Sequence, residues 1–298
     1  MNRFSSFALT LVLTLAVSRH AAAQDQDLLL RLGLSKHQYV VSEPVFLRTS
    51  LINTGDSAIS VRRLYLPHGY FNIVINNSSG KTFPLAYEAT TARDSTRSVK
   101  LEPHDSASIV IDLLPLYAEG EQILRKMHTK TFFDPGSYTV RATFETGHGK
   151  TVSRAVRFSV AAPQGAERRV CDLLVRAAKF QLDQQEAPAA STLDSIIRNS
   201  PKSAYHVQAF LQKMYLYEYK ETPEAQRKAC ATALALIDTH PASEATIPAL
   251  SYFMIHSDQI GKTPKDIRKT LSSILRKHPD TRIAKEAYRA LKLYHSDE

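Results

Sequence analysis

Histidine and cysteine are the side chains of this sequence best suited to bind a metal or act as a nucleophile. The 298 residues include 11 histidines and 2 cysteines, and no two histidines have the spacing of metal ligands on one helix face or one strand. The motifs His-Glu-x-x-His, Gly-x-Ser-x-Gly and Cys-x-x-Cys and the glycine-rich phosphate loop are missing. The sequence therefore predicts no catalytic residue, no metal site and no cofactor.

Two histidines and both cysteines stand where structural roles are favoured. His240 and His278 each precede a proline at the same point of a repeated phrase, so we interpret them as completing the end of a helix rather than binding metal. Cys171 and Cys230 fall on predicted helices that are not nearest neighbours, although an oxidising compartment permits a disulfide between them. Two buried thiols are therefore the favoured state.

Tyrosines of the second half are candidates for binding a partner. They lie on two predicted helices, the first of which also carries flanking lysines and the second a histidine: Tyr215, Tyr217, Tyr219, Lys213, Lys220, Tyr252 and His256. A tyrosine presents both an apolar ring and a polar tip, so it suits a protein interface. The alternative is that these rings are half-buried packing residues.

The sharpest charge feature is the cationic end of the chain. Arg282, Lys285, Arg289 and Lys292 fall on one stripe of the last predicted helix. The opposite stripe is apolar and consists of Ile283, Ala287, Ala290, Leu291 and Tyr294. Such a helix can be a solubilising cap, or its basic strip can dock acidic proteins or anionic envelope surfaces. No aromatic residues interleave with the basic ones in the way that would favour nucleic acid.

These side chains must be positioned by a repeat that is marked by Pro201, Pro241 and Pro279. The prolines are 40 and then 38 residues apart, which is the length of a helix-turn-helix unit. Each unit has an apolar pair before the proline, Ser or Thr two residues after it, and alanine eight residues after it followed by a bulky residue. The later members are Ser203, Ser243 and Thr281, then Ala209, Ala249 and Ala287, then Phe210, Leu250 and Tyr288. We expect the prolines early in helices, the hydroxyls as caps and the alanines where two helices approach.

The repeated phrases resemble tetratricopeptide-type repeats in the form found in bacterial envelope proteins, with units longer than the usual length of about 34 residues. The resemblance covers roughly residues 191–294. It implies stacked helical hairpins that bind peptides or protein surfaces along a concave face. The predicted helices are approximately 170–181, 191–199, 205–219, 224–239, 244–256, 265–277 and 282–294.

The first half of the chain alternates apolar and polar residues with a period of two, as half-buried strands do. Clear examples are 45–51, 71–75, 109–113, 138–144 and 156–160. Short strands with one apolar face each can bury those faces against a second sheet, so we predict an antiparallel β-sandwich. Ser42-Glu43-Pro44-Val45 and Phe133-Asp134-Pro135-Gly136 resemble Ig-like modules of exported bacterial proteins and, more distantly, the bacillar proteinase-inhibitor sandwich.

Residues 114–130 interrupt this alternation. The segment is long for a connection within a sandwich, and its apolar residues need to be buried. We therefore expect either a short helix that caps the open end of the sheets or a binding loop.

The start of the chain is typical of a secretory signal. Met1–Ala23 combines an early Arg3, an apolar core from Phe7 to Val17 and a small-residue cleavage site at Ala21–Ala23. No later stretch reaches the roughly twenty apolar residues that a membrane span needs. We expect a periplasmic or secreted protein with no integral membrane segment and a modestly basic net charge, +9 before cleavage.

The predicted organisation is a signal peptide (1–23), an Ig-like β-sandwich domain (24–162) and a helical, tetratricopeptide-like domain (163–298). The first functional hypothesis is an exported, non-enzymatic adaptor that binds another envelope or extracellular protein. An alternative is that the sandwich inhibits a protease or acts like a pro-segment, with residues 117–128 presented as a loop. A third possibility is an enzyme with an unrecognised site.

Overall fold

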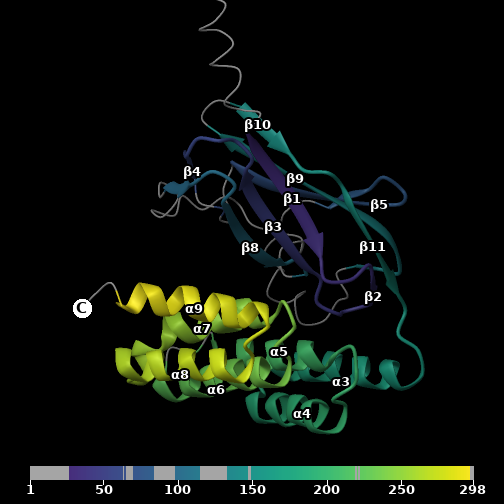
Figure 1. The fold of residues 1–298 in the computed structure, drawn as a ribbon. Coiled ribbons are helices and arrows are strands. Elements are labelled where there is room, and N and C mark those ends of the chain that lie inside the picture. Colours follow the sequence, from purple (N-terminus) through teal and green to yellow (C-terminus); the bar gives the residue numbers. More distant parts are fainter. Residues whose placement is uncertain are drawn as a thin grey trace, which may run out of the picture. The chain divides into compact units, whose positions relative to one another are not determined.

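The computed structural model describes residues 27–62, 64, 70–83, 98–114, 133–146, 149–218, 220 and 222–295. Among these residues, strands occupy the first half and seven α-helices follow in the second (Figure 1). The predicted order of sheets followed by helices is therefore confirmed. The predicted signal peptide and all of the predicted insertion except its first residue, Leu114, lie outside the described residues.

The chain divides into two compact units that do not follow a single cut in the sequence. The first unit comprises Met1–Leu34, Leu47–Ile111 and Ser137–Arg157, and the second comprises Ser35–Phe46, Asp112–Gly136 and Phe158–Glu298. Strand gives way to helix close to the predicted boundary at residue 163. The unit that holds the helices also includes two separate stretches of the strand-rich half, Ser35–Phe46 and Asp112–Gly136.

The strands form three sheets among the described residues. They are β1 (Leu28–Leu34), β2 (Gln38–Val40), β3 (Phe46–Asn53), β4 (Ile59–Arg62), β5 (Phe71–Asn77), β6 (Thr82–Phe83), β7 (Ser98–Leu101), β8 (Ser106–Asp112), β9 (Gly136–Thr146), β10 (Gly149–Val152) and β11 (Val156–Ala161). One sheet has the order β1-β3-β8, a second has β2-β11-β9-β5-β6 with β10 beside β9, and β4 pairs with β7. The second sheet is mixed, because β2 pairs with β11 in parallel where an antiparallel sandwich was expected.

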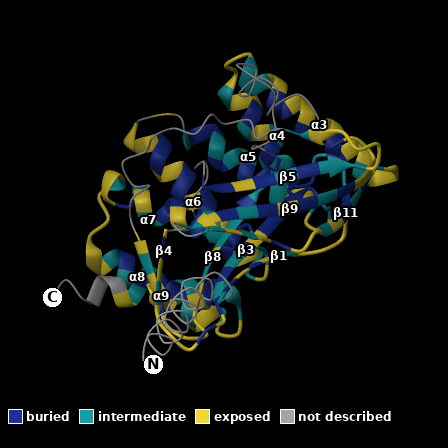
Figure 2. Ribbon diagram, turned by 90° about the horizontal axis from the view of Figure 1, so that it is seen from above, coloured by how far each residue is buried: buried dark blue, intermediate teal, exposed yellow. Residues whose placement is uncertain are grey.

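The predicted alternation is clearest in β9 and β5 of the first unit. In β9, the side chains of Tyr138, Val140, Ala142 and Phe144 are buried and their neighbours are not. The same strand pairs antiparallel with β5, which is also largely buried (Figure 2). Because alternate side chains of a strand point to opposite faces, one face of this sheet forms the core of the unit.

Asn53 ties the turn after β3 to the end of β7 within the first unit. Its side chain is fully buried, and its amide nitrogen donates to the carbonyls of Ser57, Leu101 and Glu102 at 2.8 to 3.1 Å. Its carbonyl oxygen accepts from the Gly55 N–H at 3.0 Å. A buried amide satisfied in this way fixes the turn that follows this strand.

The helices of the second unit are α3 (Gly165–Leu182), α4 (Glu186–Asn199), α5 (His206–Glu218), α6 (Pro223–Thr239), α7 (Thr246–His256), α8 (Pro264–Lys277) and α9 (Arg282–His295), with a 3-10 turn η4 (Asp258–Ile260). Successive helices pack as α3 on α4, α4 on α5, α5 on α6 and α6 on α7, and α9 packs on both α7 and α8. All seven predicted helices are present. Helix α4 begins five residues earlier than predicted, because Pro188 lies in its first turn, where a missing N–H costs nothing.

The three repeat prolines lie in turns between helices, which corrects the expectation that they open helices. Pro201 and Pro241 precede the first helical residue by five positions and Pro279 by three. The turns are nevertheless alike. The residue before each proline has φ and ψ near −131° and 49°, −129° and 54°, and −133° and 48°.

Only one of the three hydroxyls after the prolines caps the next helix as predicted. Thr281 directly precedes the first residue of α9, and its Oγ1 accepts from the Ala284 N–H at 3.3 Å. Ser203 Oγ accepts from the Tyr205 N–H at 3.1 Å and Ser243 Oγ accepts from the Ala245 N–H at 3.2 Å, and both of these N–H groups come before the first helical residue. These two hydroxyls therefore stabilise the turns that precede α5 and α7.

The repeated alanines lie at fully buried positions of the helical unit. Ala209, Ala249 and Ala287 are each 0% exposed. Each stands on a helix that packs against neighbours on both sides of the array. A larger side chain there would push helices apart, which explains why the small residue recurs.

Tyr205 joins the helices to the strand-derived piece of the second unit. Its ring is fully buried, and its hydroxyl donates to the carbonyl of Val41 at 2.7 Å. Next to Val41, the carboxylate of Glu43 forms an ion pair with Lys36 and accepts from the Val40 N–H at 3.1 Å. Because Tyr205 stands at the start of α5, this bond fixes the repeat relative to the segment Ser35–Phe46.

Two histidines form a hydrogen-bonded pair between the start of α5 and the end of α6, His206 buried and His240 half-buried. His206 Nε2 lies 2.8 Å from the Ile197 carbonyl, and His206 Nδ1 lies 2.6 Å from His240 Nε2. A carbonyl can only accept, so His206 carries its proton on Nε2 and His240 Nε2 donates to its bare Nδ1. The end of α6 is completed by the backbone N–H of His240, which donates to the Leu236 carbonyl at 2.9 Å, whereas the imidazole contacts His206 rather than the helix end that was predicted.

The first prediction concerns the alanine positions. Ala249→Leu should lower the free energy of unfolding by about 1 to 3 kcal/mol, because the added atoms have no space between the helices. Ala231→Leu on the exposed side of α6 is the matched control and should change stability little. Urea denaturation followed by circular dichroism measures both. Equal stability of the two variants would contradict the packing role of Ala249.

The second prediction concerns the pH dependence of stability. Burial, and secondly the neighbouring His206, hold the pKa of His240 below its usual 6.5. In the window below pH 6.5 the unfolded chain binds the proton first, so stability falls as pH falls. His240→Gln keeps a donor for His206 but cannot titrate, so it should lose less stability between pH 7 and pH 5 than the wild type. Identical losses in thermal denaturation would contradict this.

Candidate functional site

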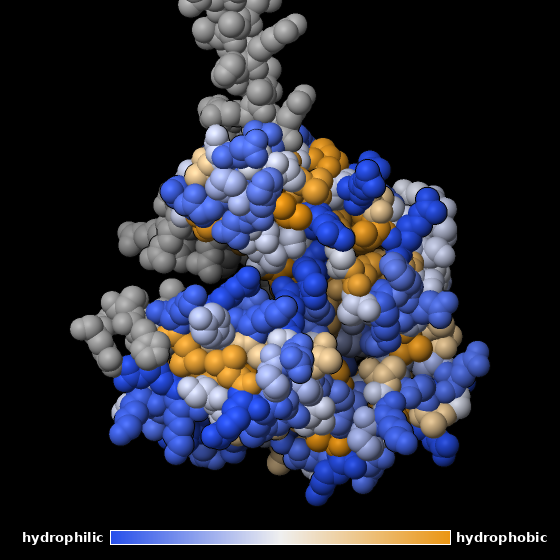
Figure 3. Space-filling model, in the orientation of Figure 1, coloured by the Kyte–Doolittle hydropathy of each residue, from blue (hydrophilic) through white to orange (hydrophobic). Residues whose placement is uncertain are grey.

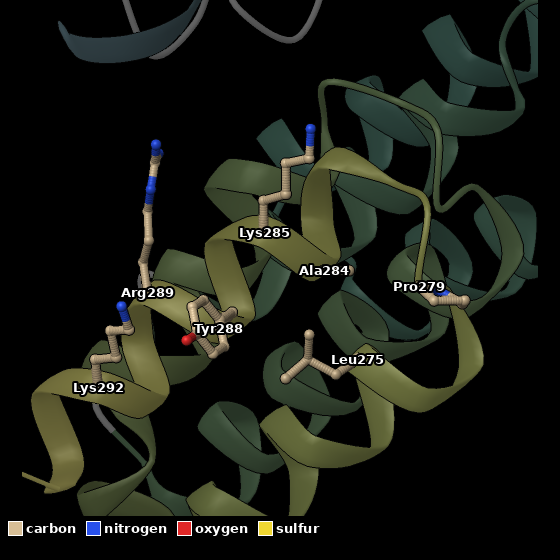
Figure 4. Close-up of a pocket in the computed structure, with 7 residues that line it drawn as sticks. All are labelled: Leu275, Pro279, Ala284, Lys285, Tyr288, Arg289 and Lys292. Atoms are coloured by element: carbon tan, nitrogen blue, oxygen red, sulfur yellow. The ribbon is translucent and has the colours of Figure 1, made fainter. Parts of the chain in front are cut away.

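A hollow formed by α8 and α9 is a candidate site within the described residues. Its volume is about 440 Å³, and its lining comes from the end of α8, the following turn and α9 (Figure 4): Leu275, Pro279, Ala284, Lys285, Tyr288, Arg289 and Lys292. We call this hollow the end groove. Leu275 and Tyr288 point toward each other from α8 and α9, while Lys285 and Arg289 extend from α9 away from Leu275.

The end groove combines an apolar floor with a cationic rim. Figure 3 shows an apolar patch between α8 and α9 that is bordered by hydrophilic surface. Tyr288 is 52% exposed, so its ring adds apolar surface to the end groove. Exposed apolar surface that is rimmed by polar residues is typical of a binding site.

The repeat explains why this surface is open. Tyr288 occupies the position that Phe210 and Leu250 occupy in the two earlier units, and those residues are 5% and 3% exposed. Leu275 corresponds in the same way to Ile237, which is fully buried, and to Ile197 of the first unit, which is half-buried as Leu275 is. In the last unit, no further unit of the described chain covers these positions.

The rim cations are available for an acidic ligand. The Lys292 ammonium lies 4.7 Å from the centre of the Tyr288 ring, and Arg289 forms an ion pair with Glu286 at 2.9 Å. Lys285 and Lys292 make no ion pair with a carboxylate in the described part of the chain. A carboxylate placed here would gain attraction that the protein's own groups leave unused.

The predicted basic strip is thus partly recovered. Lys285, Arg289 and Lys292 are exposed and belong to the end groove. Arg282 is turned to the preceding unit, where its guanidinium forms an ion pair with Glu244. The predicted apolar stripe is buried at Ile283, Ala287 and Ala290 and half-buried at Leu291, whereas the side chain of Tyr294 lies outside the described part.

The predicted tyrosine surface does not form as a continuous ridge. Tyr217 and Tyr252 are only 5% and 6% exposed, so a partner cannot contact their rings without unfolding the helices. Tyr215 is half-buried and has a partner within the chain, while Tyr219 lies outside the described residues. On a helix, residues two apart point to different sides, which is why Tyr215 and Tyr217 do not share one face.

Tyr252 belongs to a closed polar cluster instead. Its hydroxyl donates to Gln226 Oε1 at 2.6 Å, and Gln226 Nε2 donates to the carbonyls of Glu218 and Lys220 at 3.2 and 3.0 Å. Burial raises the pKa of Tyr252, and it raises the pKa of Glu218 against the opposing effect of His256. These groups satisfy one another and hold α5, α6 and α7 together.

The cysteines offer no nucleophile at neutral pH. Cys171 on α3 and Cys230 on α6 are both free and buried. Burial raises the pKa of Cys171 and raises that of Cys230 to about 11. A thiol with such a pKa stays protonated and unreactive. In the described ranges, no group of three or more His, Cys, Asp or Glu side chains could hold a metal ion.

Sequence reasoning did not identify Leu275 and Tyr288 as binding residues, although Tyr288 was noted as a repeat position. The available signal was the difference in residue type at one repeat position, where the earlier units have Phe210 and Leu250 and the last has Tyr288. A tyrosine replaces a purely apolar residue in the last unit of the described residues. Its polar tip allows the ring to remain partly in water.

Comparison with known proteins does not assign this chain to a family. No family model matches it, and no curated protein matches it. No helix of the described residues has the length and apolar character that crossing a membrane requires.

Solved structures give remote matches only. They include the DNA glycosylase AlkC of Pseudomonas fluorescens (13% identity, TM-score 0.27, 46% of this chain and 31% of that one) and sporulation control protein Spo0M of Bacillus subtilis (11%, 0.25, 50% and 55%). Alpha-2-macroglobulin of Escherichia coli is matched at 10% identity and a TM-score of 0.25 over 90% of this chain and 54% of that one. The chain spans less than two thirds of each of these proteins. At these scores, the likenesses carry no argument about function, and the end groove must be interpreted from its own residues.

Proposed function

We propose that this chain is an exported, non-enzymatic adaptor that binds another envelope or extracellular protein through the end groove. The observation that carries the proposal is the 52% exposure of Tyr288 at a position that both earlier units bury. The signal-like residues 1–23 support export to the periplasm or the medium.

The recurrence of the turns supports the resemblance to tetratricopeptide-type repeats. Three turns with nearly the same dihedral angles and three fully buried alanines are what stacked helical hairpins require. Under this proposal the β-rich half, interpreted as an Ig-like module, accompanies the helical array, and the end of the array contacts the partner.

A binding role is also supported by the chemistry of the groove. Its lining contains apolar and cationic groups, and it has no carboxylate, histidine, cysteine or hydroxyl other than the phenol of Tyr288. Such a set can recognise a partner by apolar burial and charge, but it supplies no general base and no activated nucleophile.

The third prediction tests the proposal in the cell envelope. A photo-crosslinking amino acid at position 288 should capture a partner protein identifiable by mass spectrometry. The same amino acid at position 175 is the control, because Val175 is 42% exposed on α3 and lies outside the groove. Combining position 288 with Lys285→Glu, Arg289→Glu and Lys292→Glu should abolish capture.

Two results would contradict the proposal. Absence of any captured protein at position 288, or the same set of proteins at 288 and 175, would argue against a partner at this end of the array. Circular dichroism of each variant would show whether a loss of capture reflects unfolding.

A further inference from the structure

The next step rests on the proposed function and concerns the kind of partner. We propose that the end groove receives an amphipathic α-helix of the partner that carries carboxylates beside its apolar stripe. This helix stacks on the last unit as the next helix of the array would.

The first argument is the space that an inner unit fills with its own chain. Ile237 and Leu250 are 0% and 3% exposed, and the helix that bears Leu250 packs against α9. Leu275 and Tyr288 are the corresponding pair of the last unit and are left open. The element that continues this stacking in the array is a helix, so an apolar helix face suits the end groove.

The second argument is a difference of charge between the last unit and the unit before it. Between these units, the later one supplies the cation: Lys277 contacts Asp238 at 3.0 Å and Arg282 pairs with Glu244. At the position of Asp238 the last unit has the exposed Arg276, as the first unit has Arg198, whereas Arg282 at the position of Glu244 is already paired with Glu244 itself. A helix stacked on the last unit therefore meets the cation of Arg276 where α8 meets the carboxylate of Asp238, and a carboxylate on that helix would match it.

The third argument is the composition of the rim. Lys285 and Lys292 stand where the preceding unit has Ile247 and Met254. An occupant of the end groove thus meets lysine on both sides of Tyr288 instead of aliphatic side chains. A helix with a narrow apolar stripe and flanking Asp or Glu matches this pattern, whereas a helix that is apolar all round would bury ammonium groups.

The same residues disfavour two other occupants. A second copy of this chain docked by the same face would place Lys285, Arg289 and Lys292 against the same three cations, which repel one another. An anionic bilayer contacts apolar side chains that project from a surface, but Leu275 is half-buried at the floor of a hollow. The geometry favours an acidic helix over both.

The fourth prediction uses the folded full chain and synthetic peptides. A fluorescent peptide of about 18 residues, long enough for five helical turns, carries leucines on one stripe and glutamates beside it. Fluorescence anisotropy should show binding, and Lys285→Glu, Arg289→Glu and Lys292→Glu together should weaken it by at least about tenfold. Binding should also weaken as salt concentration rises.

The matched control changes the same number of charges elsewhere on the basic end. Lys262, Lys265 and Lys269 are all exposed and lie outside the groove lining. Their combined replacement by Glu should alter the affinity by less than about threefold, because only the net charge of the protein changes. A scrambled peptide of identical composition, and a peptide with Lys in place of Glu, should bind at least about tenfold more weakly.

Several results would overturn the inference. They are equal weakening by the two triple replacements, equal binding of the scrambled peptide, or groove-dependent cosedimentation with phosphatidylglycerol vesicles without peptide binding. Capture of a partner at position 288 together with no peptide binding would also overturn it, while leaving the adaptor function intact. If no partner were captured at position 288 but the peptide bound specifically, the adaptor function would be contradicted while the preference of the end groove for an acidic helix would stand.

Discussion

The close approach of helices at Ala209, Ala249 and Ala287 is the constraint on which the helical unit depends. With no side chain beyond Cβ, the backbones can come near enough for the bulky neighbour of each alanine to fill the adjoining groove. That neighbour becomes buried only when another helix covers it. The array therefore creates, at each step, an apolar surface that the next step must cover.

This requirement leaves apolar surface uncovered at the last described unit of the array. Leu250 is covered within the chain, but Tyr288 is not, and burying a side chain of this size is ordinarily worth about 1.5 to 3 kcal/mol. The last unit lowers the free-energy cost of this exposure in two ways. The side chain ends in a phenol instead of being aliphatic, and the Lys292 ammonium lies over its ring. The surface is tolerable in water and still favourable to cover.

Local patterns in the sequence predicted the elements well, whereas their exact starts and the exposure of single rings depended on packing. Alternation identified β9 and β5, and the repeat identified the helical units. The starts of α6 and α8 are encoded by the local sequences Thr222-Pro223 and Thr263-Pro264. In each, the threonine side chain caps the helix and the proline is its first residue. Burial of Tyr217 could not be read from the sequence, because it depends on which side of α5 the neighbouring helices cover.

The basic strip illustrates why charge alone could not decide between a cap and a docking surface. Solubility requires only that the last unit be polar, and lysines at positions 285 and 292 satisfy that need. A cap gains nothing, however, from keeping Leu275 and Tyr288 open between them. Nor does solubility alone explain why the lysines stand on both sides of Tyr288, where the preceding unit has Ile247 and Met254. Both features follow together if the end of the array is built to be continued by a helix of opposite charge.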